Sequence, residues 1–105
     1  MAQFDVHRNP GRTRHAIPYV VVVQSAVFDD SRSRVVVPLV RAADVRVASE
    51  RFNPTFVVMG DAVVLHPLET TAVAIQSFGE PVASLSDHGD DILAAMDELL
   101  TRAYG

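Results

Sequence analysis

The sequence predicts a mainly β fold with one C-terminal α-helix. Valine is the commonest residue, and its branched Cβ favours the pleated surface of a strand. The apolar runs are short and are separated by clusters of Pro, Gly and Asp, which is typical of strands joined by turns. Only the last part of the chain has apolar residues at helical spacing. Strands followed by a terminal helix indicate an antiparallel, SH3-like barrel with an appended helix.

Length and composition indicate an ordinary globular protein. The chain has 105 residues, of which 49% are hydrophobic and 21% are charged, so we expect one domain over residues 1–105. It has no cysteine, and therefore neither a disulfide nor a thiolate metal site is expected. No apolar run approaches the roughly 20 residues of a membrane helix, and the N-terminus lacks the pattern of a signal peptide. We expect a cytoplasmic protein without a membrane span.

The first half predicts a strand, a loop and a hairpin. Residues 3–7 read as a short strand, and the Pro-Gly pair after it predicts an exposed loop. Residues 18–28 predict a long central strand, and the polar residues 29–33 predict a turn that leads into a partner strand over residues 34–40. Pro38 predicts that the partner strand ends at an edge or a bulge.

The second half predicts another hairpin and a further strand. Residues 41–51 do not distinguish a loop from a short strand. Residues 55–59 and 62–66 predict a hairpin around the pair Gly60-Asp61. Residues 72–78 predict a strand that ends at the turn signal of residues 79–81. The expected total is five or six strands.

The C-terminal helix is expected over residues 90–103. Ser86 or Asp87 is the predicted N-cap, and Asp90 and Asp91 suit the positive end of the helix dipole. One apolar face is expected to pack on the sheet and to be widened by two leucines. Its residues are Ile92, Met96, Leu99 and Ala103, with Leu93 and Leu100 beside them.

The net charge of −4 is unevenly distributed. The first 51 residues hold eight arginines and five acidic residues, whereas residues 61–105 hold one arginine and eight acidic residues. The net charges of the two parts are therefore about +3 and −7. Such a difference can guide an oppositely charged partner, or the charged side chains can simply solvate the surface. The arginines are not interleaved with aromatic residues, so no direct nucleic-acid readout is expected.

Motifs for catalysis or metal binding are not found. The four histidines lack the spacing of a zinc site, and no serine lies in a nucleophile elbow. The acidic pairs 29–30 and 90–91 are explained by turn and capping roles. One chemical alternative stays open: Arg12, Arg14 and His15, together with an Asp, are residue types that can cleave RNA by acid-base catalysis.

Six segments in order resemble the CcdB family of toxins. They are residues 1–6, 22–25, 34–39, the Asn-Pro pair 53–54 before 57–61, 79–86 and the pair 91–92. The resemblance covers almost the whole chain. It implies a homodimeric SH3-like barrel that binds the A subunit of DNA gyrase and traps the enzyme on cleaved DNA. It further implies a partly disordered, CcdA-like antitoxin as a second partner, and neither a catalytic residue nor a cofactor.

The resemblance also implies a surface for gyrase and antitoxin on the end of the long strand and on the helix. The residues at matching positions are Phe4, Ser25, Val27, Phe28, Asp97, Leu100 and Thr101, and Tyr104 forms an aromatic-Gly end with Gly105. Family members that poison gyrase insert an aromatic tail into it, whereas this chain contains no tryptophan. Two alternatives therefore stay open beside a gyrase poison: an inactive relative that binds only antitoxin, and a ribonuclease toxin on the same barrel.

Overall fold

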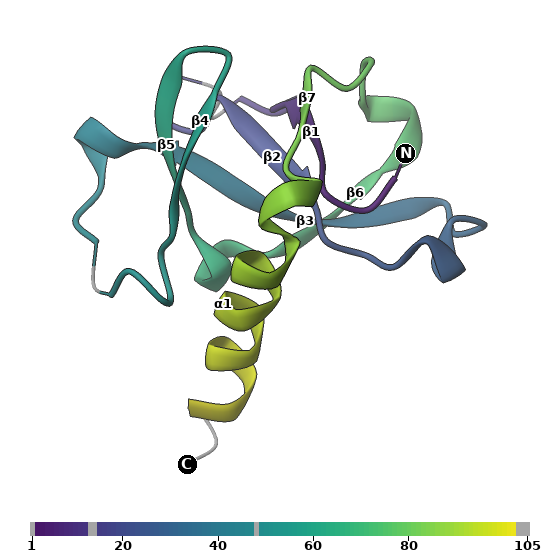
Figure 1. Cartoon of the computed structure of the whole chain (residues 1–105). Coiled ribbons are helices and arrows are strands. Elements are labelled where there is room, and N and C mark those ends of the chain that lie inside the picture. Colours follow the sequence, from purple (N-terminus) through teal and green to yellow (C-terminus); the bar gives the residue numbers. More distant parts are fainter. Residues whose placement is uncertain (1, 13–14, 48, 103–105) are drawn as a thin grey trace.

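The protein is a strongly curved antiparallel sheet that forms a nearly closed barrel, with one helix packed against it (Figure 1). The computed structural model describes residues 2–12, 15–47 and 49–102. The strands are β1 (Asp5–Arg8), β2 (Tyr19–Val22), β3 (Ser33–Arg41), β4 (Thr55–Val58), β5 (Asp61–Leu65), β6 (Thr71–Ala74) and β7 (Ala83–Ser84). The helix is α1 (Gly89–Arg102), and the short 3-10 turns are η1 (Ala26–Phe28), η2 (Ala42–Asp44), η3 (Pro67–Glu69), η4 (Ile75–Ser77) and η5 (Ser86–His88). The predicted fold class is confirmed.

The nine-residue strand β3 organises the sheet. The strand order is β4-β5-β3-β2-β1-β7, and β6 pairs with β3 outside that path. On one side β3 pairs with β2, which confirms the first predicted hairpin. On its other side it pairs first with β6 and then with β5. One strand with two successive partners lets the sheet curl toward closure.

Pro38 lies inside β3, not at its end as predicted. It pairs with Val20 of β2, and its carbonyl oxygen accepts a hydrogen bond of 3.0 Å from the N–H of His66. The pairing with β6 ends at Val36 and the pairing with β5 starts at Leu39. The missing N–H of the proline therefore faces the point where β3 changes partner, and no ladder hydrogen bond is lost there.

The β4–β5 hairpin is confirmed, but its turn is one residue earlier than predicted. Val58 already pairs with Asp61, so the two-residue loop is Met59-Gly60. Both loop residues have positive φ angles, of 52° and 82°, as a type I′ turn requires. Asp61 is the first residue of β5 instead of the second residue of the turn.

Two of the predicted strands are too long. β2 ends at Val22, and β6 ends at Ala74, opposite Ser33, which is the first residue of β3. β6 stops where β3 begins, and the chain after it forms η4. β2 stops although β3 continues to Ser33, and the chain leaves the sheet there and forms η1. Within residues 41–51, which the sequence left undecided, Arg41 ends β3, and the described residues after it form η2 and no further strand.

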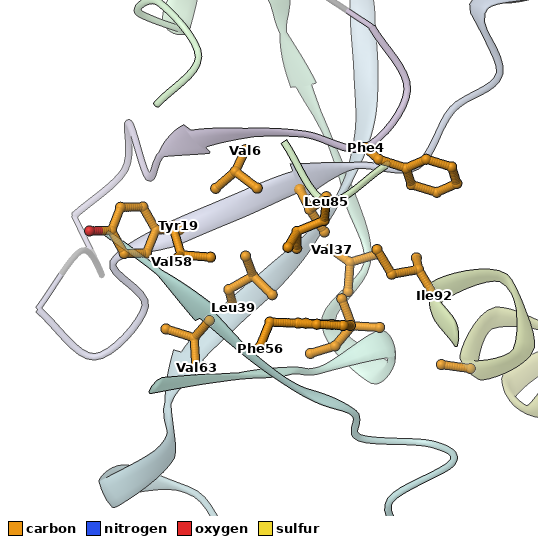
Figure 2. Close-up of a cluster of buried hydrophobic side chains, with 13 residues drawn as sticks. Phe4, Val6, Tyr19, Val37, Leu39, Phe56, Val58, Val63, Leu85 and Ile92 are labelled. Carbon is orange, nitrogen blue, oxygen red and sulfur yellow. The ribbon is translucent and has the colours of Figure 1, made fainter. Parts of the chain in front are cut away.

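The main core fills the barrel and is closed by α1 (Figure 2). The helix contributes Ile92 and Ala95, both fully buried, and packs Met96 against the same cluster. Leu93 and Leu100 are exposed, so the prediction that they widen the packing face was wrong. Their positions lie about a quarter turn around the helix axis from Ile92, beside the packing face and outside it. Ala103 lies outside the described residues.

The start of the helix also differs from the prediction. η5 runs directly into α1, so Ser86 and Asp87 lie within a helical turn and neither is the N-cap. Before η5, the two-residue strand β7 pairs with β1 and brings the total to seven strands in the described chain. This pairing places the first residues of α1 beside the N-terminal segment. No helix in the described ranges is long and apolar enough to cross a membrane.

Candidate functional site

The predicted surface residues fall into three separate places. Ser25, Val27 and Phe28 are in or next to η1, whereas Asp97, Leu100 and Thr101 are in the last turns of α1. Phe4 lies in the turn before β1, and Tyr104 is outside the described residues. In Figure 1 the η1 turn and the end of α1 project at different sides of the barrel. The chain does not bring these two groups into one pocket.

The η1 turn exposes two large apolar side chains. Val27 is 81% exposed and Phe28 is 60% exposed. Ser25 precedes the turn as its N-cap, and its Oγ accepts a hydrogen bond of 3.3 Å from the N–H of Val27. The serine hydroxyl therefore supports the turn, while the side chains of Val27 and Phe28 point into solvent.

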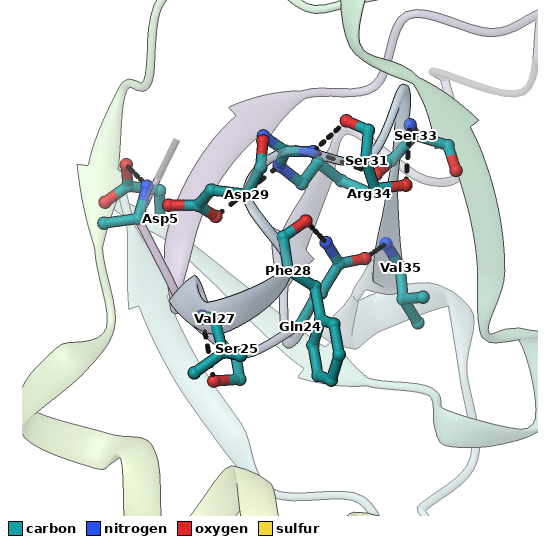
Figure 3. A network of polar contacts seen from close by, with 11 residues as sticks. Asp5, Gln24, Ser25, Val27, Phe28, Asp29, Ser31, Ser33, Arg34 and Val35 are labelled. Carbon is teal, nitrogen blue, oxygen red and sulfur yellow. Dashed lines mark hydrogen bonds and ion pairs between the residues drawn. The ribbon is translucent and has the colours of Figure 1, made fainter.

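A buried arginine holds the segment that follows η1 (Figure 3). Arg34 is 5% exposed, and its Nη1 donates to the carbonyl oxygens of Ser31 and Ser33 at 2.7 and 3.0 Å. Its Nη2 donates to the carbonyl oxygen of Asp29 at 2.6 Å. The Asp29 carboxylate lies 3.9 Å from Nε of the same guanidinium. One side chain thereby fixes the backbone of the whole loop between η1 and β3.

Gln24 holds the turn from the other side. Its Nε2 donates to the carbonyl oxygen of Phe28 at 2.9 Å, and its Oε1 accepts from the N–H of Val35 at 3.1 Å. The side chain continues the β2–β3 ladder beyond the point where the backbone leaves it. A shallow, mainly apolar groove lies beside the turn and is lined in part by Val23, Phe28 and Val35. The result is a rigid apolar projection beside an apolar hollow.

The end of α1 offers a second, smaller apolar surface. Leu100 is 69% exposed, and Asp97 and Thr101 are exposed beside it. The hydroxyl of Thr101 donates to the carbonyl oxygen of Asp97 at 2.5 Å, which is the i to i−4 bond that Thr commonly makes in helices. Apolar area at this tip therefore comes from the leucine, while the threonine hydroxyl is turned back onto the helix.

Phe4 is a core residue in the isolated chain. It is 9% exposed and belongs to the main cluster, with a positive φ of 70° and an N–H bond of 2.6 Å to the carbonyl oxygen of Val22. Its ring is packed so closely on Gly89 that a Cβ there would lie 2.7 Å from the ring. Phe4 thus connects β1 to the first turn of the helix.

The residues of the ribonuclease alternative are only partly brought together. Arg12 and His15 are exposed, and Arg14 lies outside the described residues. His15 lines a small pocket with Asp61, and the cations in that pocket are Arg8 and Arg41 instead of Arg12. Within the described ranges no group of three or more His, Cys, Asp or Glu residues is arranged to hold a metal ion.

Sequence reasoning missed the two residues that position the turn, Gln24 and Arg34. The sequence held one signal for each of them. Gln24 interrupts a long apolar run, and Arg34 is a lone charged residue directly before three valines. Polar side chains at such positions are favourable because they make hydrogen bonds to backbone N–H and C=O groups that no neighbouring strand pairs.

Comparison with known proteins agrees with this architecture. The family model described as CcdB protein matches residues 3–102. Among curated proteins no match was found. Because the family match spans nearly the whole chain, and because the barrel with a single C-terminal helix agrees with it, the protein belongs to the CcdB family of toxin-antitoxin toxins.

Proposed function

We propose that this chain is the toxin of a type II toxin-antitoxin system, and that it binds the A subunit of DNA gyrase and traps the gyrase–DNA cleavage complex. A cognate, CcdA-like antitoxin neutralises it, and the active form is a cytoplasmic homodimer. Membership of the CcdB family supports this proposal. The observation that supports particular contact residues is the η1 turn, which is held by side-chain hydrogen bonds and exposes two apolar side chains.

The turn has the properties of a protein-binding hot spot. Aromatic side chains that fill a partner's pocket contribute most where they are held in the bound conformation beforehand, since less conformational freedom is then lost on binding. The carbonyl oxygen of Phe28 is bound by Gln24, and that of Asp29 by Arg34. Phe28 is thus presented by a fixed backbone and is the primary contact of the proposal, with Val27 beside it.

The tip of α1 is the second contact of the proposal. Leu100 supplies apolar area, and Asp97 supplies a carboxylate one turn earlier. Because the two contacts lie on different sides of the barrel, one partner must be large or extended to reach both, or two protomers must each present one. A disordered antitoxin that folds on binding is suited to wrapping such a divided surface.

Binding without catalysis agrees with how the polar groups of this surface are used. The hydroxyls of Ser25 and Thr101 both make backbone hydrogen bonds within their own turns. Among the described residues no acid-base partner contacts either hydroxyl, and we assign a contact role to the surface.

A second candidate is an inactive relative that binds antitoxin but not gyrase. The observation in its favour is the end of α1, where Leu100 is followed by a threonine whose hydroxyl bonds to its own helix. A tip of this kind presents less apolar area than one that carries a large aromatic residue.

The two candidates are separated by binding measurements on purified full-length protein with gyrase A subunit and, separately, with its cognate antitoxin. Wild-type protein is expected to bind both and to accumulate cleaved DNA in a gyrase reaction. Phe28→Ala should weaken gyrase binding about 30-fold, the equivalent of about 2 kcal/mol for a hot-spot residue. Leu68→Ala, which removes an equally exposed side chain on η3, is the matched control and should change binding less than twofold.

Antitoxin binding without gyrase binding would support the inactive relative. Equal losses of gyrase affinity for Phe28→Ala and Leu68→Ala would show that the η1 turn is not the contact surface. The thermal unfolding temperature of each variant shows whether the fold is retained.

A further inference from the structure

A pocket lies at the far end of β3 from the η1 turn, where the ends of four strands meet. Its lining includes Arg8, His15, Tyr19, Arg41 and Asp61. Since β3 is nine residues long, the pocket and the η1 turn are separated by about 25–30 Å along the strand. The pocket is therefore distinct from the surface proposed for gyrase and antitoxin.

The strand pairing brings two arginines to this pocket. Arg8 is the last residue of β1 and pairs with Tyr19, the first residue of β2. The guanidinium carbon of Arg8 lies 5.9 Å from the centre of the Tyr19 ring, a cation–π distance that places the charge over the ring face. The ring itself is at the edge of the main core, with its hydroxyl directed out of it (Figure 2).

Arg41 is held on the opposite wall by the loop between β1 and β2. Its N–H donates to the carbonyl oxygen of Ala16 at 3.4 Å, and its Nε donates to the carbonyl oxygen of His15 at 3.3 Å. The first of these bonds is made by the backbone N–H, and only the second uses the guanidinium, through its inner edge. Its Nη1 faces Asp61 at 3.6 Å, and both side chains are 43% exposed.

The charges of the pocket are not balanced. Arg8 forms no ion pair with any residue in the described ranges, and the contact of Arg41 with Asp61 is long and exposed. Exposed pairs of this kind contribute little and are readily exchanged. Two guanidinium groups against one carboxylate leave an excess positive charge, in a chain whose net charge is −4.

We propose that this pocket binds a phosphate group, held between the guanidinium groups of Arg8 and Arg41. Guanidinium groups recognise phosphate oxygens through paired, charge-assisted hydrogen bonds. The exposed imidazole of His15 and the Tyr19 hydroxyl line the same site and supply further hydrogen-bond donors. Asp61 weakens binding of the anion, because its carboxylate competes with the phosphate for Arg41. The phosphate is free inorganic phosphate or the phosphate group of a nucleotide.

The test is a titration of the ¹⁵N-labelled full-length protein with inorganic phosphate at constant ionic strength, followed by NMR. Saturable shifts are expected for the backbone amides of residues 8–9, 15–17, 19, 41 and 61. Arg8→Gln and Arg41→Gln should each weaken binding at least tenfold. Arg32→Gln removes the same charge from an exposed arginine outside the pocket and should change binding less than twofold.

Asp61→Asn is the most specific variant, because a merely structural ion pair predicts the opposite sign. Removal of the carboxylate should tighten phosphate binding two- to fivefold, since Arg41 is then available to the ligand. Weaker binding by Asp61→Asn would overturn the proposal in favour of a structural role for the pair Arg41–Asp61. An equal loss with Arg32→Gln would overturn it in favour of diffuse charge attraction. Non-saturating shifts would overturn it as well.

A second arm of the titration identifies the source of the phosphate. If adenosine 5′-monophosphate binds at least fivefold more tightly than phosphate and shifts the Tyr19 ring resonances, the ligand is a nucleotide. Equal affinities, with no effect on the ring, support free phosphate. Unfolding temperatures within a few degrees of wild type show that each variant remains folded.

Discussion

The η1 turn and the last turns of α1 both expose apolar side chains, yet they are held in different ways. Phe28 is the last residue of a short 3-10 turn, and the carbonyl oxygens of Phe28 and Asp29 are bound by Gln24 and by the buried guanidinium of Arg34. Leu100 extends from a regular helix. This helix is anchored on the barrel by other residues, Ile92 and Ala95, which are buried in the main core. The turn depends on a polar network, and the helix tip depends on apolar packing several residues earlier.

The difference indicates how each surface can fail. A helix supplies its own backbone hydrogen bonds, so its tip needs only an anchor along the shaft. A loop has backbone groups without internal partners, and these need side chains to satisfy them. Loss of the anchor should detach the helix as a unit, whereas loss of the polar network should loosen the turn and the loop after it.

The largest expected effect is at the helix anchor. Ile92→Ala removes a fully buried side chain from the main core and should lower the free energy of unfolding by about 3–4 kcal/mol. Leu93→Ala, on the exposed side of the same turn, should cost less than about 1 kcal/mol. Urea denaturation measures both. Similar losses for the two variants would show that α1 does not pack as described.

The next largest effect is expected at the polar network of the turn. Arg34→Met keeps much of the side-chain volume but removes the donors to three carbonyl oxygens, and should destabilise the protein by about 2–3 kcal/mol. Faster hydrogen exchange is expected for the amides of residues 28–33. The exposed Arg32→Met, in the same loop, is the control and should leave both measurements almost unchanged.

A smaller effect is expected where β1 meets the helix. Gly89→Ala places a Cβ 2.7 Å from the Phe4 ring, and the resulting overpacking should cost about 1–2 kcal/mol despite the better helix propensity of Ala. Phe4→Leu in the same background should recover part of that loss, which a double-mutant cycle measures. Gly79→Ala has open space around it and serves as the control. A stabilising Gly89→Ala would contradict the contact.

The smallest effect is expected at the ion pair between residue 51 and the helix. Arg51 Nε lies 3.2 Å from Glu98 Oε2, and the arginine side chain is 67% exposed. Arg51→Gln should cost less than about 1 kcal/mol, and the difference from wild type should shrink in 0.5 M NaCl because salt screens exposed charges. A large loss that is independent of salt would mean that this contact, and not the core face, anchors the helix.

Local sequence signals predicted most elements but not where they end. The pair of positive φ angles at Met59 and Gly60 needs a glycine, and the hairpin was therefore found to within one residue. The strand over residues 18–28 was predicted too long, because apolar composition does not reveal that the chain leaves β3 after Val22 and forms η1. β7 was missed, since its two residues are defined only by pairing with β1.

The candidate surface was predicted in part for the same reason. The acidic pair after Phe28 was a local sign of exposure, and the structure places that side chain in solvent. Leu93 and Leu100 could not be assigned, because a leucine beside an apolar face is buried or exposed depending on which element lies next to it. Arg34 resembled a surface charge, and only the carbonyl oxygens around it make its burial favourable.

By itself, the sequence determined the β-rich class, the two hairpins and the C-terminal helix with its anchor at Ile92, because these depend on side-chain periodicity and on the conformational limits of glycine and valine. The tertiary structure decided the rest. It set the change of partner at Pro38, the burial of Arg34, the gap that Gln24 fills beside the η1 turn and the meeting of Arg8 with Arg41 at the far end of β3. The change of partner at Pro38 and the meeting of the two arginines join residues far apart in the chain. The bonds of Arg34 and Gln24 are closer in sequence, but the backbone groups that they satisfy lie within reach only when β2 and β3 are in register.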